Sequence, residues 1–272
     1  MKIKEIQSKS ILTPASGFIT EFTHTLNPYA GCAFGCSYCY VRQMPIALYR
    51  EEEWGTWVDI KKNAADLLLK EIKKAKKKGP VTIFMSTATD PYQPIEYKAR
   101  ITRSLLEAML IEKPDFLFVQ TRSPLCTRDI DLFQQFGQSI RVSMTIETDL
   151  EYIRKAFTPS APPIPARLKA LKQITEAGVP TQVAVAPLLP CSNRIAKTLR
   201  QVTSRAVIDN FFMGDGSRGK RTEKMGIRAI YQRLNLLPWY HPNAYKVVLK
   251  LLQQEFEDVE LLISQQGFMP NQ

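Results

Sequence analysis

The sequence predicts an α/β fold: a partial (β/α)6 barrel of the TIM type with a C-terminal helical extension. Short apolar segments alternate with longer amphipathic segments over about residues 13–213, which is the pattern of parallel βαβ units. Polar segments such as STATDPYQP, TRSPLCTRD and SMTIETD follow the apolar segments directly. They would meet at the edge of a parallel sheet where ligands bind. The 272 residues suffice for one large domain or two small ones.

The expected elements follow in order along the chain. A strand over residues 18–26 precedes a cysteine-rich loop, and a helix over residues 58–77 follows that loop. Further strands are predicted at residues 81–86, 116–120, 140–146, 181–186 and 206–213, and further helices at 98–111, 129–136, 165–177 and 194–205. These six units are two short of a complete eight-fold barrel. A doubly wound open sheet would present its ligand at the same edge, in a flatter cleft.

The rest of the chain is predicted to pack on this barrel. It contains the segment NLLPWYHP and the amphipathic segment AYKVVLKLLQQEF. We expect the barrel and its N-terminal lead-in to occupy residues 1–213. A loop and a helix, not a second domain, would occupy residues 214–272.

The composition is basic, with a formal net charge of +11 and a pI of about 9.4. Lysines end the predicted helix in KEIKKAKKKGP, where they complement the helix dipole, and GDGSRGKRTEKMGIR is a basic loop that could hold phosphates. Nucleic acid and a merely solvated basic surface both fit this charge. No segment approaches the ~20 apolar residues of a membrane span, and no signal peptide is evident. We expect a cytoplasmic, monomeric protein with reduced thiols and no membrane association.

Three of the five cysteines, Cys32, Cys36 and Cys39, lie within eight residues. A structural zinc site needs four ligands, usually in two close pairs, and His24 could in principle supply the fourth. A four-iron, four-sulfur cluster with three thiolates fits the spacing better, because one iron then stays open to bind another molecule. The spacing therefore favours a cluster with an open coordination site.

The motif Cys32-x3-Cys36-x-Tyr38-Cys39 resembles the cluster motif of the radical S-adenosylmethionine (SAM) superfamily. NPYAGCAFGCSYCY, TDPYQPIE and TRSPLCTRDIDLF are similar to segments of its spore photoproduct lyase-like branch, over most of residues 18–215. The resemblance implies a partial (β/α)6 barrel, with a [4Fe-4S] cluster and SAM as cofactors. It also implies reductive cleavage of SAM to a 5′-deoxyadenosyl radical that abstracts hydrogen from a substrate. A one-electron reductant such as flavodoxin or ferredoxin would be a partner.

The resemblance also implies a set of SAM-binding residues after the second, third and fourth strands: Ser86, Thr87, Asp90, Arg122 and Ser143. Hydroxyls suit the methionyl and ribose groups, Arg122 suits a carboxylate, and Asp90 suits an ammonium group. Each has an ordinary alternative as well. The first two hydroxyls could simply end a strand, Asp90 could start a turn, and Arg122 could pair with Asp129.

Four residues are candidates for the radical chemistry itself. Tyr38 and Tyr40 correspond to tyrosines associated with radical relay in the lyase, although they could equally pack around the cluster and exclude water. The lyase uses a cysteine after its second strand as hydrogen donor, where this chain has Thr87, whose O–H bond is too strong for that role. Cys126 and Cys191 could donate hydrogen instead, or could be small buried apolar residues.

Two classes of function follow. In the first, a radical SAM enzyme acts on a nucleic-acid base, with the SRGKRTEK loop on phosphates and Trp239 and Tyr240 stacking on a base. The two aromatic side chains could instead pin the C-terminal segment to the barrel. A radical SAM enzyme for a small metabolite or peptide is a variant of this class. In the second class, the protein is a non-catalytic iron–sulfur redox sensor.

Overall fold

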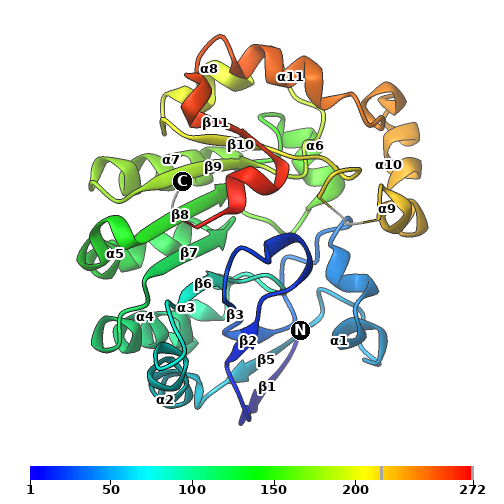
Figure 1. Ribbon diagram of the computed structural model, residues 1–272. Helices are drawn as coiled ribbons and strands as arrows, with labels where there is room; N and C mark the ends of the chain where they lie inside the picture. The colour runs from blue at the N-terminus through cyan, green and yellow to red at the C-terminus, as the bar shows by residue number, and fades with distance from the viewer. Residues whose placement is uncertain (215–216, 271–272) are drawn as a thin grey trace.

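Six parallel strands form the centre of the main sheet. They are β3 (His24–Leu26), β6 (Thr82–Met85), β7 (Phe116–Thr121), β8 (Ile140–Thr145), β9 (Thr181–Val185) and β10 (Ala206–Ile208). The computed structural model describes residues 1–214 and 217–270. β2 (Leu12–Pro14) pairs antiparallel with β3 at one edge, and β11 (Leu261–Ile263) pairs parallel with β10 at the other. The sheet is open between these two edges, which confirms the partial barrel (Figure 1).

Helices cover the outer side of this sheet (Figure 1): α2 (Ala64–Lys76), α4 (Ile101–Ile111), α5 (Ile130–Phe136), α7 (Ile164–Glu176) and α8 (Ile195–Arg200). Their buried side chains recur at helical spacing, as Leu68 and Ile72 do on α2. Together with the outward-facing residues of the strands they form the main hydrophobic core. This packing holds the carboxyl ends of the strands at one edge.

Aromatic side chains fill the inner side of the sheet. Phe84 on β6 stacks on Phe118 on β7 with ring centroids 4.8 Å apart. Phe268, in the 3-10 turn η7 (Ser264–Phe268), packs on Phe118 at 6.1 Å. Gln182 Nε2 donates a hydrogen bond of 2.9 Å to the carbonyl of Gly267. The C-terminal segment, red in Figure 1, therefore packs against the inner side of the barrel.

The predicted helix over residues 58–77 is partly wrong. Its first residues belong to β5 (Trp57–Lys61), which pairs with β1 (Lys2–Ile6) and β4 (Tyr29–Ala30) in a separate three-stranded sheet. Trp57, Val58 and Ile60 are buried there, and β1 supplies backbone partners from the start of the chain. Helix α2 therefore begins only at Ala64.

The predicted strand over residues 18–26 is also too long. Gly17–Ile19 forms a 3-10 turn, which begins with Gly17 at a positive φ of 67°, and only His24–Leu26 pairs with the sheet. The C-terminal segment contains more structure than the expected loop and helix. It forms α9 (Lys220–Lys224), α10 (Ile227–Arg233) and α11 (Tyr245–Leu252), and it adds β11 to the main sheet.

Other boundaries shift by a few residues. The helix predicted from residue 98 begins at Ile101, because Arg100 is in the left-handed region at φ 53° and separates α4 from α3 (Glu96–Ala99). The predicted strand over 206–213 ends at Ile208, and the predicted helix over 194–205 ends at Arg200. Two short helices, α1 (Pro45–Leu48) and α6 (Glu151–Phe157), are additional. Within the described residues, no helix has the length and apolar character needed to cross a bilayer.

Candidate functional site

The three clustered cysteines lie on the loop between β4 and the 3-10 turn η2 (Tyr40–Gln43). Cys32 and Cys36 are buried, and Cys39 is half-buried. Hydrogen bonds from Gly35 N to the carbonyl of Cys32 (3.3 Å) and from Cys39 N to the carbonyl of Cys36 (3.2 Å) turn the loop back on itself. Burial and the neighbouring Cys36 raise the pKa of Cys39 to about 12. Ligation by a metal would instead hold these thiols as thiolates.

Contacts from several elements fix the conformation of this cysteine loop. The guanidinium of Arg42 donates to the carbonyls of Cys36 (2.9 Å, from Nε) and Gly35 (2.8 Å, from Nη2). Gln93 Oε1 accepts a hydrogen bond of 2.8 Å from Ala33 N. These hydrogen bonds tie the loop backbone to fixed protein groups at several points, which favours a preorganised arrangement of its three thiols.

The donor set suits a cluster better than a single zinc ion. Within residues 1–214 and 217–270, no three histidine, cysteine or acidic side chains are placed to hold one metal ion. The ring Nδ1 of His24 hydrogen-bonds to Thr23 Oγ1 at 2.8 Å, so the zinc alternative gains no support. In an iron–sulfur cluster each thiolate binds a different iron, and three thiols on one loop fit that requirement.

Unsatisfied polar atoms lie at the carboxyl ends of β6 and β7. Ser86 is buried, and its Oγ has no hydrogen-bond partner among the described residues. Its φ of 77° is rare for a non-glycine residue and costs about 1–3 kcal/mol. Gln120 Nε2 donates to Thr145 Oγ1 at 2.7 Å, while Gln120 Oε1 has no partner in the described chain. A polar ligand such as SAM would satisfy these atoms.

The geometry of the cysteine loop beside this edge agrees with the match to a known family. The family model of the Radical SAM superfamily matches residues 26–200, which is more than half of the chain. This chain belongs to the radical SAM superfamily. It is therefore a radical SAM enzyme, and the family implies an iron–sulfur cluster, SAM and an electron donor.

Relatives of this radical SAM protein occur in archaea, viruses and bacteria. An uncharacterized protein of Methanocaldococcus jannaschii is 34% identical over 190 residues, which cover 70% of this chain and 69% of the relative. An uncharacterized protein of Acidianus two-tailed virus is 31% identical over 65% of this chain and 59% of its own length. One from Mycobacterium tuberculosis is 32% identical over 68% of this chain and 56% of its own.

Solved structures share the fold. Spore photoproduct lyase complexed with dinucleoside spore photoproduct aligns with a TM-score of 0.65 at 15% identity, over 96% of this chain and 81% of the lyase chain. Streptococcus suis SuiB bound to S-adenosylmethionine aligns with a TM-score of 0.52 at 14% identity, over 88% of this chain and 46% of SuiB. At these identities the alignments establish the radical SAM fold and not the substrate.

Among the predicted SAM ligands, Asp90 and Ser143 make structural contacts. Asp90 accepts hydrogen bonds from Tyr92 N (2.9 Å), Thr121 Oγ1 (2.7 Å) and Arg122 N (2.9 Å). Burial raises the pKa of Asp90 despite these bonds. Ser143 is fully buried on β8 and accepts from Gln182 Nε2 at 3.2 Å. These contacts favour the ordinary reading of Asp90 as part of a turn.

Thr87 and Arg122 lie beside the two tyrosines of the cysteine loop. Thr87 Oγ1 accepts from Asn27 Nδ2 at 3.2 Å, and its carbonyl accepts from the hydroxyl of Tyr40. Arg122 Nη1 donates to Tyr38 Oη at 3.0 Å. The predicted alternative for Arg122 was a pair with Asp129. That carboxylate is bound instead by two other arginines, Arg103 and Arg128.

The two isolated cysteines differ in their positions. Cys126 is completely buried in the main core beneath the outer helices. Cys191 is half-buried beyond β9, and its thiol donates to the carbonyl of Leu189 at 3.2 Å. Burial raises the pKa of both thiols, so both stay protonated at neutral pH. Both thiols remain candidate hydrogen donors, and Cys191 is the less buried of the two.

Sequence reasoning missed Glu147, which lies just beyond β8 in the segment SMTIETD. It is 1% exposed and accepts hydrogen bonds from Tyr38 Oη (2.8 Å), Arg122 Nη1 (3.0 Å) and Arg167 Nη1 (2.6 Å). The position of SMTIETD at the edge of the sheet was the only signal. The partner Arg167 lies twenty residues further along, on α7.

Glu147 also gives the stability a pH dependence. Arg167 and Arg122 overcome burial and lower the pKa of this carboxyl to about 2, from 4.5 in the unfolded chain. A lowered folded-state pKa contributes stability that is complete above about pH 5 and lost as the pH falls toward 2. In urea unfolding of the apoprotein from pH 6 to pH 3, we expect wild type to lose more stability than Glu147→Gln. Equal losses would contradict this assignment.

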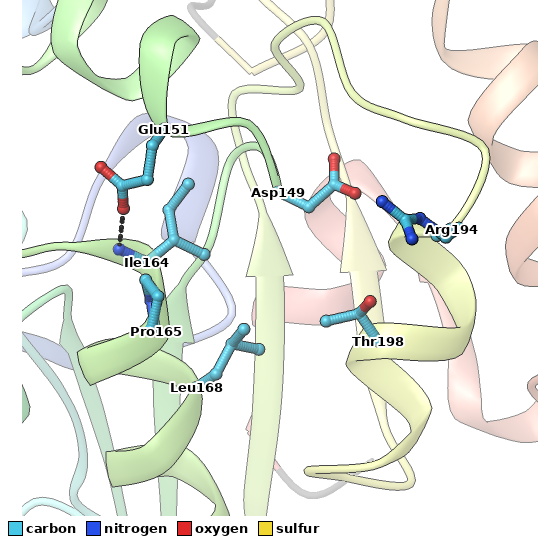
Figure 2. A pocket seen from close by; sticks show the side chains of 7 residues that line it. All are labelled: Asp149, Glu151, Ile164, Pro165, Leu168, Arg194 and Thr198. Atoms are coloured by element: carbon cyan, nitrogen blue, oxygen red, sulfur yellow. Dashed lines mark hydrogen bonds between the residues drawn. The ribbon is translucent and has the colours of Figure 1, made fainter.

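Neither of two cavities in the structure is lined by Ser86 or Gln120. Figure 2 shows one of about 270 Å³ between α7 and α8, where Asp149 and Arg194 face each other across the opening. A second, of about 520 Å³, is lined by Ser37 of the cysteine loop, with Arg42, Leu48, Trp54 and others. Of these two, only the second is lined by a residue of the three-cysteine loop, Ser37.

Proposed function

We propose that Cys32, Cys36 and Cys39 bind a [4Fe-4S] cluster, and that bound cluster and SAM supply a 5′-deoxyadenosyl radical for hydrogen abstraction from a substrate. The main support is the position of the three-cysteine loop, which hydrogen bonds hold in place beside a sheet edge where Ser86 Oγ and Gln120 Oε1 are unsatisfied among the described residues. Three thiolates leave room for a second ligand on the cluster. Membership of the radical SAM superfamily supports the same chemistry.

The residues around the loop have separate roles in this proposal. Arg122 binds the SAM carboxylate through its guanidinium. Within the described residues it uses only Nη1 and its backbone N–H in hydrogen bonds, so Nε–H and Nη2–H are available for this contact. Ser86 Oγ and Gln120 Oε1 bind polar groups of SAM. Tyr38 is buried beside the cluster ligands and excludes water. Cys191 keeps its proton, and in this proposal it returns a hydrogen atom to the substrate.

A single assay tests the chemistry. Protein reconstituted with iron and sulfide without oxygen is mixed with dithionite and SAM, and 5′-deoxyadenosine is measured. We expect the product to form even without substrate, at a slow rate. An intact cluster with no product above the background of dithionite and SAM alone would favour the redox sensor, and would overturn the enzymatic proposal.

For the substrate we propose a nucleic-acid base, with a small metabolite or peptide as the alternative. Basic residues gather on α9 and its flanks, namely Arg218, Lys220, Arg221, Lys224 and Arg228. Helix α9 packs against η2, and Arg221 on this helix lies within electrostatic range of Tyr40. Tyr240 packs on Tyr231 at 5.3 Å and on Phe212 at 5.4 Å, which favours a packing role for this tyrosine.

The salt dependence of binding tests the nucleic-acid substrate. We expect single-stranded DNA or RNA to bind with an affinity that falls as salt rises, because phosphate contacts release counterions. Replacing Lys220 and Lys224 with glutamine should reduce the slope of log K against log salt by about 1.4. The matched control is Lys73→Gln with Lys76→Gln on α2, where both lysines face Glu112. No binding, or an equal slope change in the control, would favour the metabolite or peptide.

A further inference from the structure

Glu147 occupies the space between two arginines and a tyrosine beneath the cysteine loop. Its Oε1 accepts from Tyr38 Oη at 2.8 Å and from Arg122 Nη1 at 3.0 Å. Its Oε2 accepts from Arg167 Nη1 at 2.6 Å. Glu147 is 1% exposed and Arg167 is completely buried. A buried carboxylate with this many charge-assisted hydrogen bonds has a single well-defined position.

Arg122 is the part of this network that faces outward. Its Nη1 bonds to both Glu147 and Tyr38, and its side chain keeps 14% exposure. Within the described residues, its Nε–H and Nη2–H groups have no hydrogen-bond acceptor. They are therefore available to a ligand. A long arginine side chain would otherwise sample many rotamers, so the anchor at Nη1 lowers the entropic cost of binding a carboxylate.

Tyr38 connects the same carboxylate to the cluster ligands. It stands between Cys36 and Cys39 in the sequence, and the guanidinium carbon of Arg122 lies 5.8 Å from its ring centroid. The Glu147 carboxylate accepts a hydrogen bond from the hydroxyl of this tyrosine, which places its charge beside the segment that carries Cys36 and Cys39. Hydrogen bonding and charge around the ligand sulfurs are two of the means by which a protein sets cluster potential.

We propose that Glu147 is a positioning residue of this radical SAM site, which holds Arg122 toward the SAM carboxylate and Tyr38 against the cluster loop. The inference rests on the cofactor roles proposed above. Glu147 contacts neither cofactor in this account and acts through the two side chains it orients. Its buried negative charge, hydrogen-bonded to Tyr38 of the cysteine loop, also lowers the reduction potential of the cluster.

The orientation of Arg122 is tested by two double variants. Removing Glu147 alone would leave Arg167 buried without its carboxylate, so both variants also carry Arg167→Met. One has Glu147→Gln, which keeps an acceptor for Arg122 and Tyr38, and the other has Glu147→Ala, which does not. At equal iron content, without reductant, we expect the alanine variant to bind SAM about tenfold more weakly than the glutamine variant.

The electrostatic role is tested without SAM. The midpoint potential of the cluster, followed by electron paramagnetic resonance, should be higher in the double variant with Glu147→Gln and Arg167→Met than in Arg167→Met alone, because the two proteins differ by one nearby negative charge. The control Asp149→Asn removes a carboxylate that bonds to Ser192 instead, and its potential should match wild type. Equal SAM affinities in the Gln and Ala double variants, or equal potentials in the Glu147→Gln, Arg167→Met variant and in Arg167→Met alone, would overturn the role of Glu147. Wild type that takes up iron but binds no SAM would overturn the proposed function itself.

Discussion

Replacing Cys36 with alanine is expected to remove both bound iron and SAM cleavage. In the proposed function three thiols form the ligand set of the loop, and two thiolates would hold the cluster too weakly to survive purification. Cys36 is also buried, so no water or buffer ligand can readily take its place. We expect iron per chain to fall close to background, and 5′-deoxyadenosine to fall by at least about a thousandfold, to the detection limit.

Cys126→Ala is the matched control for this prediction. Its thiol is buried in the main core, apart from the three-cysteine loop, and loss of one small sulfur should cost only about 1 kcal/mol of stability. Iron content and the visible absorption of the cluster should stay close to wild type. Retained iron in Cys36→Ala, or a similar loss in Cys126→Ala, would contradict the ligand assignment.

Replacing Gly31 with alanine is expected to destabilise the protein by about 3 kcal/mol and to impair iron uptake. Gly31 directly precedes Cys32 and has a φ of 81°. A Cβ at this position would lie 2.4 Å from the carbonyl oxygen of Trp57 and 2.6 Å from its ring. The loop would have to move away from β5, and Cys32 would move with it. Urea unfolding of the apoprotein and iron per chain measure the two effects.

Gly178→Ala separates this clash from the cost of the backbone conformation. Gly178 has a φ of 79°, but a Cβ there would meet nothing within 4 Å. This control should therefore lose only about 1–2 kcal/mol, the cost of a left-handed non-glycine residue. It should keep its full iron content. If Gly31→Ala and Gly178→Ala lose the same unfolding free energy and bind the same amount of iron, close packing of Gly31 on Trp57 does not determine the conformation of the cysteine loop.

Buried strands were the most predictable part of the fold. β6, β7, β8 and β9 lie within their predicted ranges or within one residue of them, because strands covered on both faces appear as continuous apolar segments. The helices behind them were predictable for the same reason, from their periodic apolar faces. The failures, β5 and the start of the 18–26 strand, lie where the partner segment is far away or where a glycine turns the chain.

The site was predictable only in part. The three cysteines were evident from their spacing within one loop. The ligand-binding edge, at the carboxyl ends of the strands, was evident from the polar segments that follow each strand. Glu147 was not, because its role depends on contacts with residues 109, 25 and 20 positions away in the chain. The role of Asp90 was not evident either, because two of its three hydrogen-bond donors, Thr121 and Arg122, are more than thirty residues away in the chain.

The sequence by itself determined the βα alternation, the open barrel and the cysteine loop, because each is encoded by residues that are close together in the chain. Only the tertiary structure decided which polar side chains at the sheet edge stay available to a ligand. Asp90 and Ser143 are hydrogen-bonded to protein groups, whereas Ser86 Oγ and Gln120 Oε1 have no partner in the part of the chain that the structure describes. Hydrogen bonds between distant segments satisfy some polar atoms and leave others unsatisfied, and local sequence does not specify those pairings.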